Sequence, residues 1–97
     1  MSIFAVSYTY TDDVATRDEV RPGHRDFLRG LNAEGVVRAS GPVDGGTGAL
    51  VIVEATSAEA ALGILDADPF EVRGVIAERS VRQWDVVIGG LAEQVSR

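Results

Sequence analysis

The chain has 97 residues, enough for one domain of packed sheet and helices but too few for a separate cofactor domain. Nine basic residues, all of them arginine, oppose fifteen acidic ones, so the net charge is -6 and no lysine could form a Schiff base. An acidic surface repels phosphate backbones and anionic lipids. This composition argues against nucleic acid and membrane as partners.

The chain contains no cysteine, which excludes disulfides, thiolate metal sites and cysteine nucleophiles and fits a reducing cytosol. Its first residues lack the basic start and long apolar run of a signal peptide. No apolar run approaches the ~18 residues that a membrane span requires. With one histidine, a metal would depend on scattered aspartates. We expect a cytoplasmic protein without metal or other cofactor.

The first two elements are predicted from hydrophobic periodicity. Residues 3–10 alternate with a period of two and favour a strand. Residues 21–35 favour an amphipathic helix, with Pro22 in the first turn and Gly35 as a left-handed stop. Alternatively, Thr16 and Glu19 form a capping box, which would start the helix earlier and leave Pro22 inside it.

The rest of the chain continues the alternation of strands and helices. We expect a strand over 36–43, a hairpin turn over 44–48, an apolar central strand over 49–55, a helix over 58–67, a short turn over 70–74, a strand over 75–87 and a tail over 91–97 that could be a frayed helix. Gly41-Pro42 indicates a bulge or bend near the end of its strand. Ser57 is a good N-cap, and Asp68-Pro69 ends that helix. The last strand should bend around Gln83 or Trp84.

This order of elements is that of the ferredoxin-like split βαβ arrangement, an α+β fold in which two helices cover one face of an antiparallel sheet. Residues 1–89 form the expected domain and residues 90–97 a C-terminal tail. The first and third strands also carry apolar or small residues toward the other face. Because that face would be partly exposed in a monomer, we expect a homodimer.

His24, the only histidine, lies on the apolar stripe of the first predicted helix. His24, Phe27, Leu28 and Leu31 follow the spacing of one helical face, whereas Arg25, Arg29 and Asn32 fall on the other side. One interpretation is a structural imidazole bonded to a backbone carbonyl. The other is a proton carrier, which requires a carboxylate that holds its second nitrogen.

Asp68 is the preferred carboxylate partner, because the Asp-Pro-Phe sequence after a helix holds its side chain on a constrained turn. Its alternative interpretation is an ordinary turn or helix-ending aspartate. Asp66, Asp26 and Asp85 are weaker candidates. Asp26 is two residues from His24 and would face away from it on a helix.

Aromatic and basic side chains could complete a binding site. Tyr8, Phe70 and Trp84 are expected to line an apolar pocket, and Arg21 or Arg38 could meet an anionic group. The alternatives are core packing for the aromatic rings and a solvated surface for the arginines. The glycine run at 44–48 lacks the lysine and following helix of a phosphate-binding loop, so it is interpreted as a hairpin.

The residues that repeat in a known family are Arg21-Pro-Gly-His24, Leu28-Arg-Gly-Leu31, Gly35, Ser40-Gly41-Pro42, Gly48, Ser57-Ala-Glu-Ala60, Asp68-Pro69-Phe70 and Gln83-Trp84. In this order and at this spacing they resemble the YciI (YCII-related) family over residues 3–89. The one departure is Gln83, which replaces the usual proline before the tryptophan.

The resemblance implies a ferredoxin-like fold that pairs as a dimeric α+β barrel, similar to muconolactone isomerase. It implies a His-Asp active site that maps onto His24 and Asp68. One branch of the family is associated with dehydrochlorination of chlorinated hydroxyquinols, which suggests proton abstraction and elimination on small cyclic or aromatic compounds. The residues expected to bind the substrate are Arg21, Ser40, Phe70, Trp84 and Tyr8.

Three functional hypotheses follow. The first is a cofactor-independent lyase or isomerase in which His24 transfers a proton and Asp68 orients it. The second is a small-molecule-binding or accessory module of the same fold without turnover. The third is a cofactor-independent oxygenase of the related dimeric-barrel type, which would need an oxidisable substrate.

Overall fold

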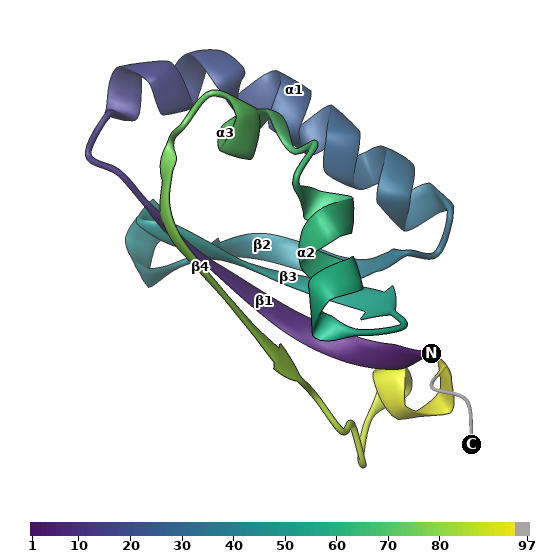
Figure 1. Ribbon diagram of the computed structural model, residues 1–97. Helices are drawn as coiled ribbons and strands as arrows, with labels where there is room; N and C mark the ends of the chain where they lie inside the picture. Colours follow the sequence, from purple (N-terminus) through teal and green to yellow (C-terminus); the bar gives the residue numbers. More distant parts are fainter. Residues whose placement is uncertain (95–97) are drawn as a thin grey trace.

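The computed structural model describes residues 1–94 as a four-stranded sheet with all its α-helices on one face (Figure 1). The elements are β1 (Ser2–Tyr10), α1 (Val14–Ala33), β2 (Val37–Val43), the 3-10 turn η1 (Asp44–Gly46), β3 (Gly48–Ala55), α2 (Ala58–Leu65), α3 (Pro69–Val72), β4 (Ile76–Gln83) and the 3-10 helix η2 (Gly90–Gln94). The predicted βαββαβ order is confirmed. The short α3 turn takes the place of the predicted turn after α2.

The sheet is antiparallel throughout, with strand order β2-β3-β1-β4. The apolar strand β3 is an interior strand, as its composition predicts. Register places Val6 of β1 between Val51 of β3 and Val81 of β4. Because side chains alternate across a strand, this row faces the helices together with Phe4 and Tyr8.

The core lies between this sheet face and the helices. Val6, Val51 and Val53 of the sheet and Ala61 and Leu65 of α2 are completely buried. Ser57 accepts a hydrogen bond from the backbone N–H of Ala60 and caps α2 as predicted. Burial of this apolar surface is the main force that holds the helices on the sheet.

Helix α1 begins earlier than the pattern over 21–35 predicts. It starts at Val14, and its cap is Asp13, whose carboxylate accepts a hydrogen bond from the backbone N–H of Thr16. The prediction that Pro22 opens the helix is therefore wrong, and the alternative that leaves it inside is confirmed, with a different cap. The earlier start adds two turns of helix and buries Val20 on the same face as His24. This burial offsets the loss of the one helical hydrogen bond that Pro22, which has no N–H, cannot donate. Gly35 has the predicted left-handed conformation, with φ of 82°.

Two strand predictions need correction. The register shift in β2 lies between Val37 and Ala39, not at Gly41-Pro42. Pro42 stays in register because β2 is an edge strand, where a residue without an N–H is tolerated. Strand β4 ends at Gln83, short of the predicted end at residue 87. It ends at Gln83, where the sequence predicted a bend, and the backbone N–H of Trp84 still donates to the carbonyl of Ile3 at 2.8 Å.

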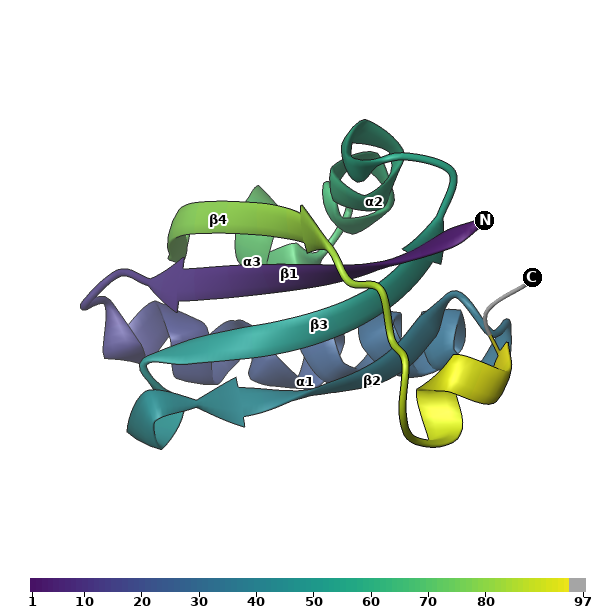
Figure 2. The ribbon, with the colours of Figure 1, turned by 90° about the horizontal axis from the view of Figure 1, so that it is seen from below.

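In the part of the chain that the structure describes, the second sheet face carries no α-helix (Figure 2). The segment after β4 crosses it and ends in η2, so the predicted helical tail is a 3-10 turn, and the remainder of that prediction lies outside the described residues. Leu50 and Val43 on this face are each 37% exposed. Among residues 1–94, no helix has the length and apolar character needed to cross a membrane.

Candidate active site

Asp68 is delivered to the interior by the connection between α2 and α3. Its carboxylate caps α3 by accepting a hydrogen bond from the backbone N–H of Phe70 at 2.9 Å, and Pro69 occupies the first helical position. The side chain is completely buried. A buried carboxylate must be well supplied with hydrogen-bond donors, because transfer of a charge out of water is costly.

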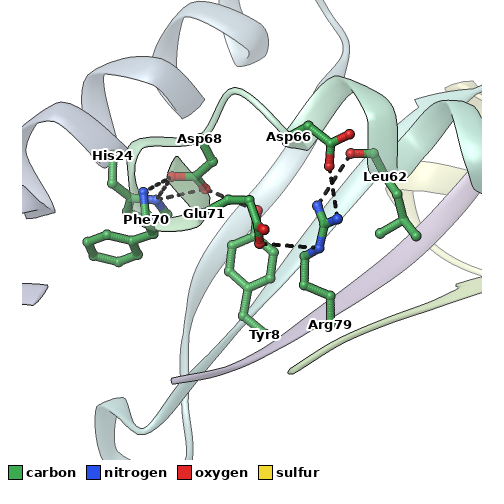
Figure 3. Close-up of polar contacts among 8 residues, drawn as sticks. All are labelled: Tyr8, His24, Leu62, Asp66, Asp68, Phe70, Glu71 and Arg79. Atoms are coloured by element: carbon green, nitrogen blue, oxygen red, sulfur yellow. Dashed lines mark hydrogen bonds and ion pairs between the residues drawn. The ribbon is translucent and has the colours of Figure 1, made fainter. Parts of the chain in front are cut away.

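His24 supplies one of those donors from the middle of α1. Its Nδ1 lies 2.8 Å from Oδ1 and 2.9 Å from Oδ2 of Asp68 (Figure 3). The expectation that these two side chains meet is confirmed. Helices α1 and α3 come close at this point, since a Cβ added to Gly23 would lie 3.7 Å from Cγ of Pro69.

Tyr8 of β1 completes the set of donors around Asp68. Its hydroxyl donates to Oδ2 at 3.0 Å from below, and the side chain is 2% exposed. Burial, followed by the negative charge of Asp68, raises the pKa of the Tyr8 hydroxyl above its ordinary value of 10.0. The phenol therefore stays protonated and remains a donor over the physiological pH range. Three elements, β1, α1 and α3, thus converge on one carboxylate.

Aromatic rings fix the plane of the imidazole. Phe70 stacks on His24 with ring centroids 3.9 Å apart and an angle of 6° between the planes. Tyr10 in turn packs edge-on against Phe70, with the two ring centroids 5.3 Å apart. A ring held by stacking and by a carboxylate at Nδ1 has little freedom to rotate. This is the preorganisation that a proton-transfer group requires.

The hydrogen-bond network assigns the histidine tautomer. The Asp68 carboxylate already accepts from Tyr8 and Phe70, and an ionised carboxylate can only accept, so Nδ1 of His24 carries a proton. In the neutral ring Nε2 is then the basic nitrogen. Nε2 has no hydrogen-bond partner within residues 1–94. It is the ring atom left for a bound molecule.

A pocket of about 590 Å³ opens beside the ring and is lined by His24 and Phe70. Its other wall residues come mainly from α1 and β2. The apolar part of the wall includes Tyr10, Leu28, Val37, Pro42 and Ala49. The volume and the apolar lining are those of a small-molecule site.

The pocket contains some of the predicted binding residues and not others. Arg21, Ser40 and Phe70 line it as expected. Trp84 does not, because it follows the end of β4 and is 43% exposed there. Tyr8 does not either, since its ring lies beneath Asp68 and its hydroxyl is used by that carboxylate. Arg38 is instead engaged by Glu54 on the neighbouring strand β3.

The other candidate carboxylates are occupied elsewhere. Asp26 pairs with Arg29 on the surface of α1, and Asp66 pairs with Arg79 at 2.9 Å. Asp85 accepts from the Gln83 amide at 3.4 Å. Within the described part of the chain, no group of three or more His, Asp or Glu side chains is arranged to hold a metal ion.

Arg79 of β4 anchors the connection that carries Asp68. Its guanidinium reaches Asp66 at 2.9 Å, Glu71 at 3.5 Å and the backbone carbonyl of Leu62 at 3.4 Å (Figure 3). These contacts tie both sides of the Asp68 turn to the strand that pairs with Tyr8. Sequence reasoning did not find this role, because the partners are 8 to 17 residues away.

Arg25, Arg29 and Asn32 were predicted to lie away from the apolar stripe of α1. They are exposed as that placement implies, yet all three line the rim of the pocket together with Arg21. The pocket is open along that edge of the helix. The signal was present in the spacing, because Arg21, Arg25 and Arg29 recur every four residues beside His24.

Comparison with known proteins supports a family assignment. A family model described as the YCII-related domain matches residues 1–85. Protein YciI of Escherichia coli O6:H1 (strain CFT073) is 36% identical over 86 residues, which cover 78% of this chain and 88% of the relative. The uncharacterized protein YjpA of Bacillus subtilis (strain 168) is 37% identical over 62 residues, which cover 64% and 72% of the respective chains.

A solved structure shares the fold. It is 5-chloro-2-hydroxyhydroquinone dehydrochlorinase (TftG) from Burkholderia phenoliruptrix AC1100, in complex with 2,5-dihydroxybenzoquinone. The TM-score is 0.72 at 24% sequence identity, over 84% of this chain and 92% of that one. At this identity the likeness shows the fold.

Proposed function

The chain belongs to the YCII-related domain family, and from this premise and the geometry of its buried pair we propose that it is a cofactor-independent lyase or isomerase. The observation that carries the proposal is the contact of Nδ1 of His24 with both carboxylate oxygens of Asp68 in the wall of a pocket. This arrangement leaves Nε2 as a base directed at a small molecule.

The proposed step is a proton transfer. Nε2 of His24 accepts a proton from a C–H or O–H bond of the substrate, and the electron pair of that bond shifts to form a double bond or to expel a leaving group. The imidazolium that forms is stabilised by the negative charge of the Asp68 carboxylate. Returning the proton to another atom gives isomerisation, and losing a leaving group gives elimination.

The substrate class proposed is a small cyclic or aromatic compound. The apolar wall of the pocket suits a ring, and its volume of about 590 Å³ is within the range for small-molecule sites. The related fold of a dehydrochlorinase bound to a hydroxyquinone supports this class. The second hypothesis, binding without turnover, uses the same pocket and differs only in whether Nε2 moves a proton.

We also infer that the active form is a homodimer. Leu50 and Val43 leave apolar surface on the helix-free face of the sheet, and Val87 and Ile88, in the segment after β4, are 81% and 91% exposed. Pairing of this face with a second copy would remove the surface from water. Closure of two sheets around each other would give the dimeric α+β barrel that the family resemblance implies.

The test is the substitution His24→Asn, assayed with 5-chloro-2-hydroxyhydroquinone as the first of a set of chlorinated and unchlorinated hydroxyquinols. The Asn amide can still donate to Asp68 but has no atom at the position of Nε2. We expect kcat to fall about 10²- to 10⁴-fold, the usual contribution of a general base, with the fold unchanged by circular dichroism.

The control is Asp26→Asn, which removes an exposed carboxylate of the same helix whose ion-pair partner among residues 1–94 is Arg29. It should keep wild-type turnover. Wild-type turnover in the His24→Asn protein would refute the catalytic role. If the wild-type protein binds members of the set but converts none, the binding-module hypothesis replaces the enzyme.

A further inference from the structure

The pocket rim is basic although the molecule is acidic. Arg21, Arg25 and Arg29 follow one another at intervals of four along α1 and all line the pocket. Among the described residues, no Asp or Glu side chain lines it, even though the chain has fifteen acidic residues against nine basic ones. Such a concentration of one sign in a concave site raises the local potential and attracts ligands of the opposite sign.

The three arginines differ in how they are engaged. Arg21 pairs with Asp18 at 2.8 Å and Arg29 pairs with Asp26 at 3.1 Å, so each has an acidic neighbour on the outer side of the helix. Arg25, between them, makes no ion pair or hydrogen bond with residues 1–94. Its guanidinium is the cation of the rim that remains available to a ligand.

The position of this cation relative to His24 fits the chemistry of proton abstraction. Arg25 follows His24 directly in α1, and both line the same cavity. Loss of a proton to Nε2 leaves negative charge on the substrate, and a guanidinium near that charge stabilises it. A planar oxyanion is also the group that a guanidinium binds best, through two parallel N–H···O bonds.

Building on the proposed function, we propose that the pocket selects an anionic ring compound, whose carboxylate or ionised hydroxyl binds Arg25 while its apolar body packs against Leu28, Val37 and Phe70. Arg21 and Arg29 contribute positive potential, and the selectivity depends on Arg25. Neutral rings of the same shape bind more weakly because they leave this cation without a partner.

The experiment measures binding rather than turnover. Isothermal titration calorimetry and NMR chemical-shift changes of the full chain give the affinity for each probe. The anionic probes are benzoate and 2,5-dihydroxybenzoquinone, whose hydroxyl groups are vinylogous acids that are ionised at neutral pH. The neutral counterparts are benzamide and 2,5-dimethoxybenzoquinone. We expect each anion to bind about tenfold more tightly than its counterpart, and its affinity to fall as salt is raised.

The variant is Arg25→Gln and the matched control is Arg82→Gln, which removes an exposed arginine on β4 outside the pocket. Arg25→Gln should weaken the binding of the anions about tenfold and leave the affinity for the neutral probes unchanged. Arg82→Gln should alter neither affinity. Equal binding of anionic and neutral probes, equal effects of the two variants, or no saturable binding of either anion would overturn the anion site.

These outcomes separate the two proposals. A protein that binds anions through Arg25 but shows no turnover would refute the enzyme and leave the anion site standing. A protein whose activity depends on His24 but not on Arg25, with neutral substrates preferred, would refute the anion site alone.

Discussion

At the scale of single residues, the site is a carboxylate that receives three donors from distant parts of the chain. His24, Tyr8 and the backbone N–H of Phe70 all donate to Asp68. Tyr8 touches neither the pocket nor a ligand position, so it acts through Asp68 as a positioning residue. Its phenol holds the carboxylate in the orientation that meets the imidazole.

Tyr8→Phe tests this positioning role through stability at different pH values. Removal of one donor to a buried carboxylate should cost about 1–2 kcal/mol near neutral pH. The pKa of the Tyr8 hydroxyl is raised in the folded state above the ordinary 10.0, so the wild type binds that proton more tightly when folded than when unfolded. The stabilisation that the folded protein gains from this tighter proton binding is complete below pH 10. As the pH rises above 10, the free energy of unfolding loses up to ~1.4 kcal/mol per pH unit from this source.

The advantage of the wild type over Tyr8→Phe should therefore shrink above pH 10, as measured by urea unfolding over a series of pH values. Tyr10 has a pKa that is also raised by burial and by Asp68, but it is present in both proteins and cancels in the difference. A stability difference that stays constant up to about pH 11 would contradict the prediction.

At the scale of elements, close backbone approaches decide where glycine is required. A Cβ at Gly48 would lie 2.4 Å from the backbone oxygen of Tyr8, which is closer than atoms can come. At Gly30 in α1 a Cβ would meet nothing within 4 Å. The two glycines have the same appearance in the sequence and opposite roles in the structure.

Gly30→Ala and Gly48→Ala should therefore have opposite effects on the free energy of unfolding. The alanine in α1 should stabilise the protein by about 0.5–1 kcal/mol, because it restricts the unfolded chain and favours helix. The alanine in β3 should destabilise it by about 2–3 kcal/mol, because β1 and β3 must separate to admit the methyl group. Chemical unfolding of both variants checks the pair, and a shift of the same sign in both would contradict the argument.

Element boundaries show what a local pattern can predict. The strands follow from alternation, and the second helix follows from its Ser57 cap. The start of α1 was misplaced because Pro22 is a strong local signal against a helix interior. Packing of Val20 beside Phe70 and Val75 and of Leu28 in the main core overrides that signal, and the energy of this packing cannot be seen in the local sequence.

At the scale of the whole molecule, the two faces of the sheet differ. Within residues 1–94, one face is covered by three α-helices, and the other is crossed by the segment after β4 (Figure 2). Leu50 remains 37% exposed on the second face, in register with Ser7 of β1. Apolar side chains in such a position are typical of an interface between copies.

Leu50→Asp tests the proposed homodimer. A carboxylate at the centre of the proposed interface would be buried without a partner, so we expect the wild type to sediment as a dimer and the Leu50→Asp protein as a monomer at micromolar concentration. Val72→Asp introduces the same charge at an exposed valine on α3 and should leave the dimer intact. A wild type that sediments as a monomer, or a dimer that tolerates aspartate at residue 50, would contradict the interface.

By itself the sequence determined the order of elements, the apolar face of each, and the presence of one inward-facing histidine, because these depend on periodicities that neighbouring residues impose. The Asp-Pro-Phe turn made Asp68 the preferred partner of that histidine, and the family resemblance supported this choice over the alternative of an ordinary turn aspartate. Only the tertiary structure decided that Tyr8 donates to Asp68, that Arg79 anchors the turn carrying Asp68, and that the arginines of α1 line the rim of the pocket. Those contacts join residues far apart in the chain, and their distances are set by how the helices pack on the sheet.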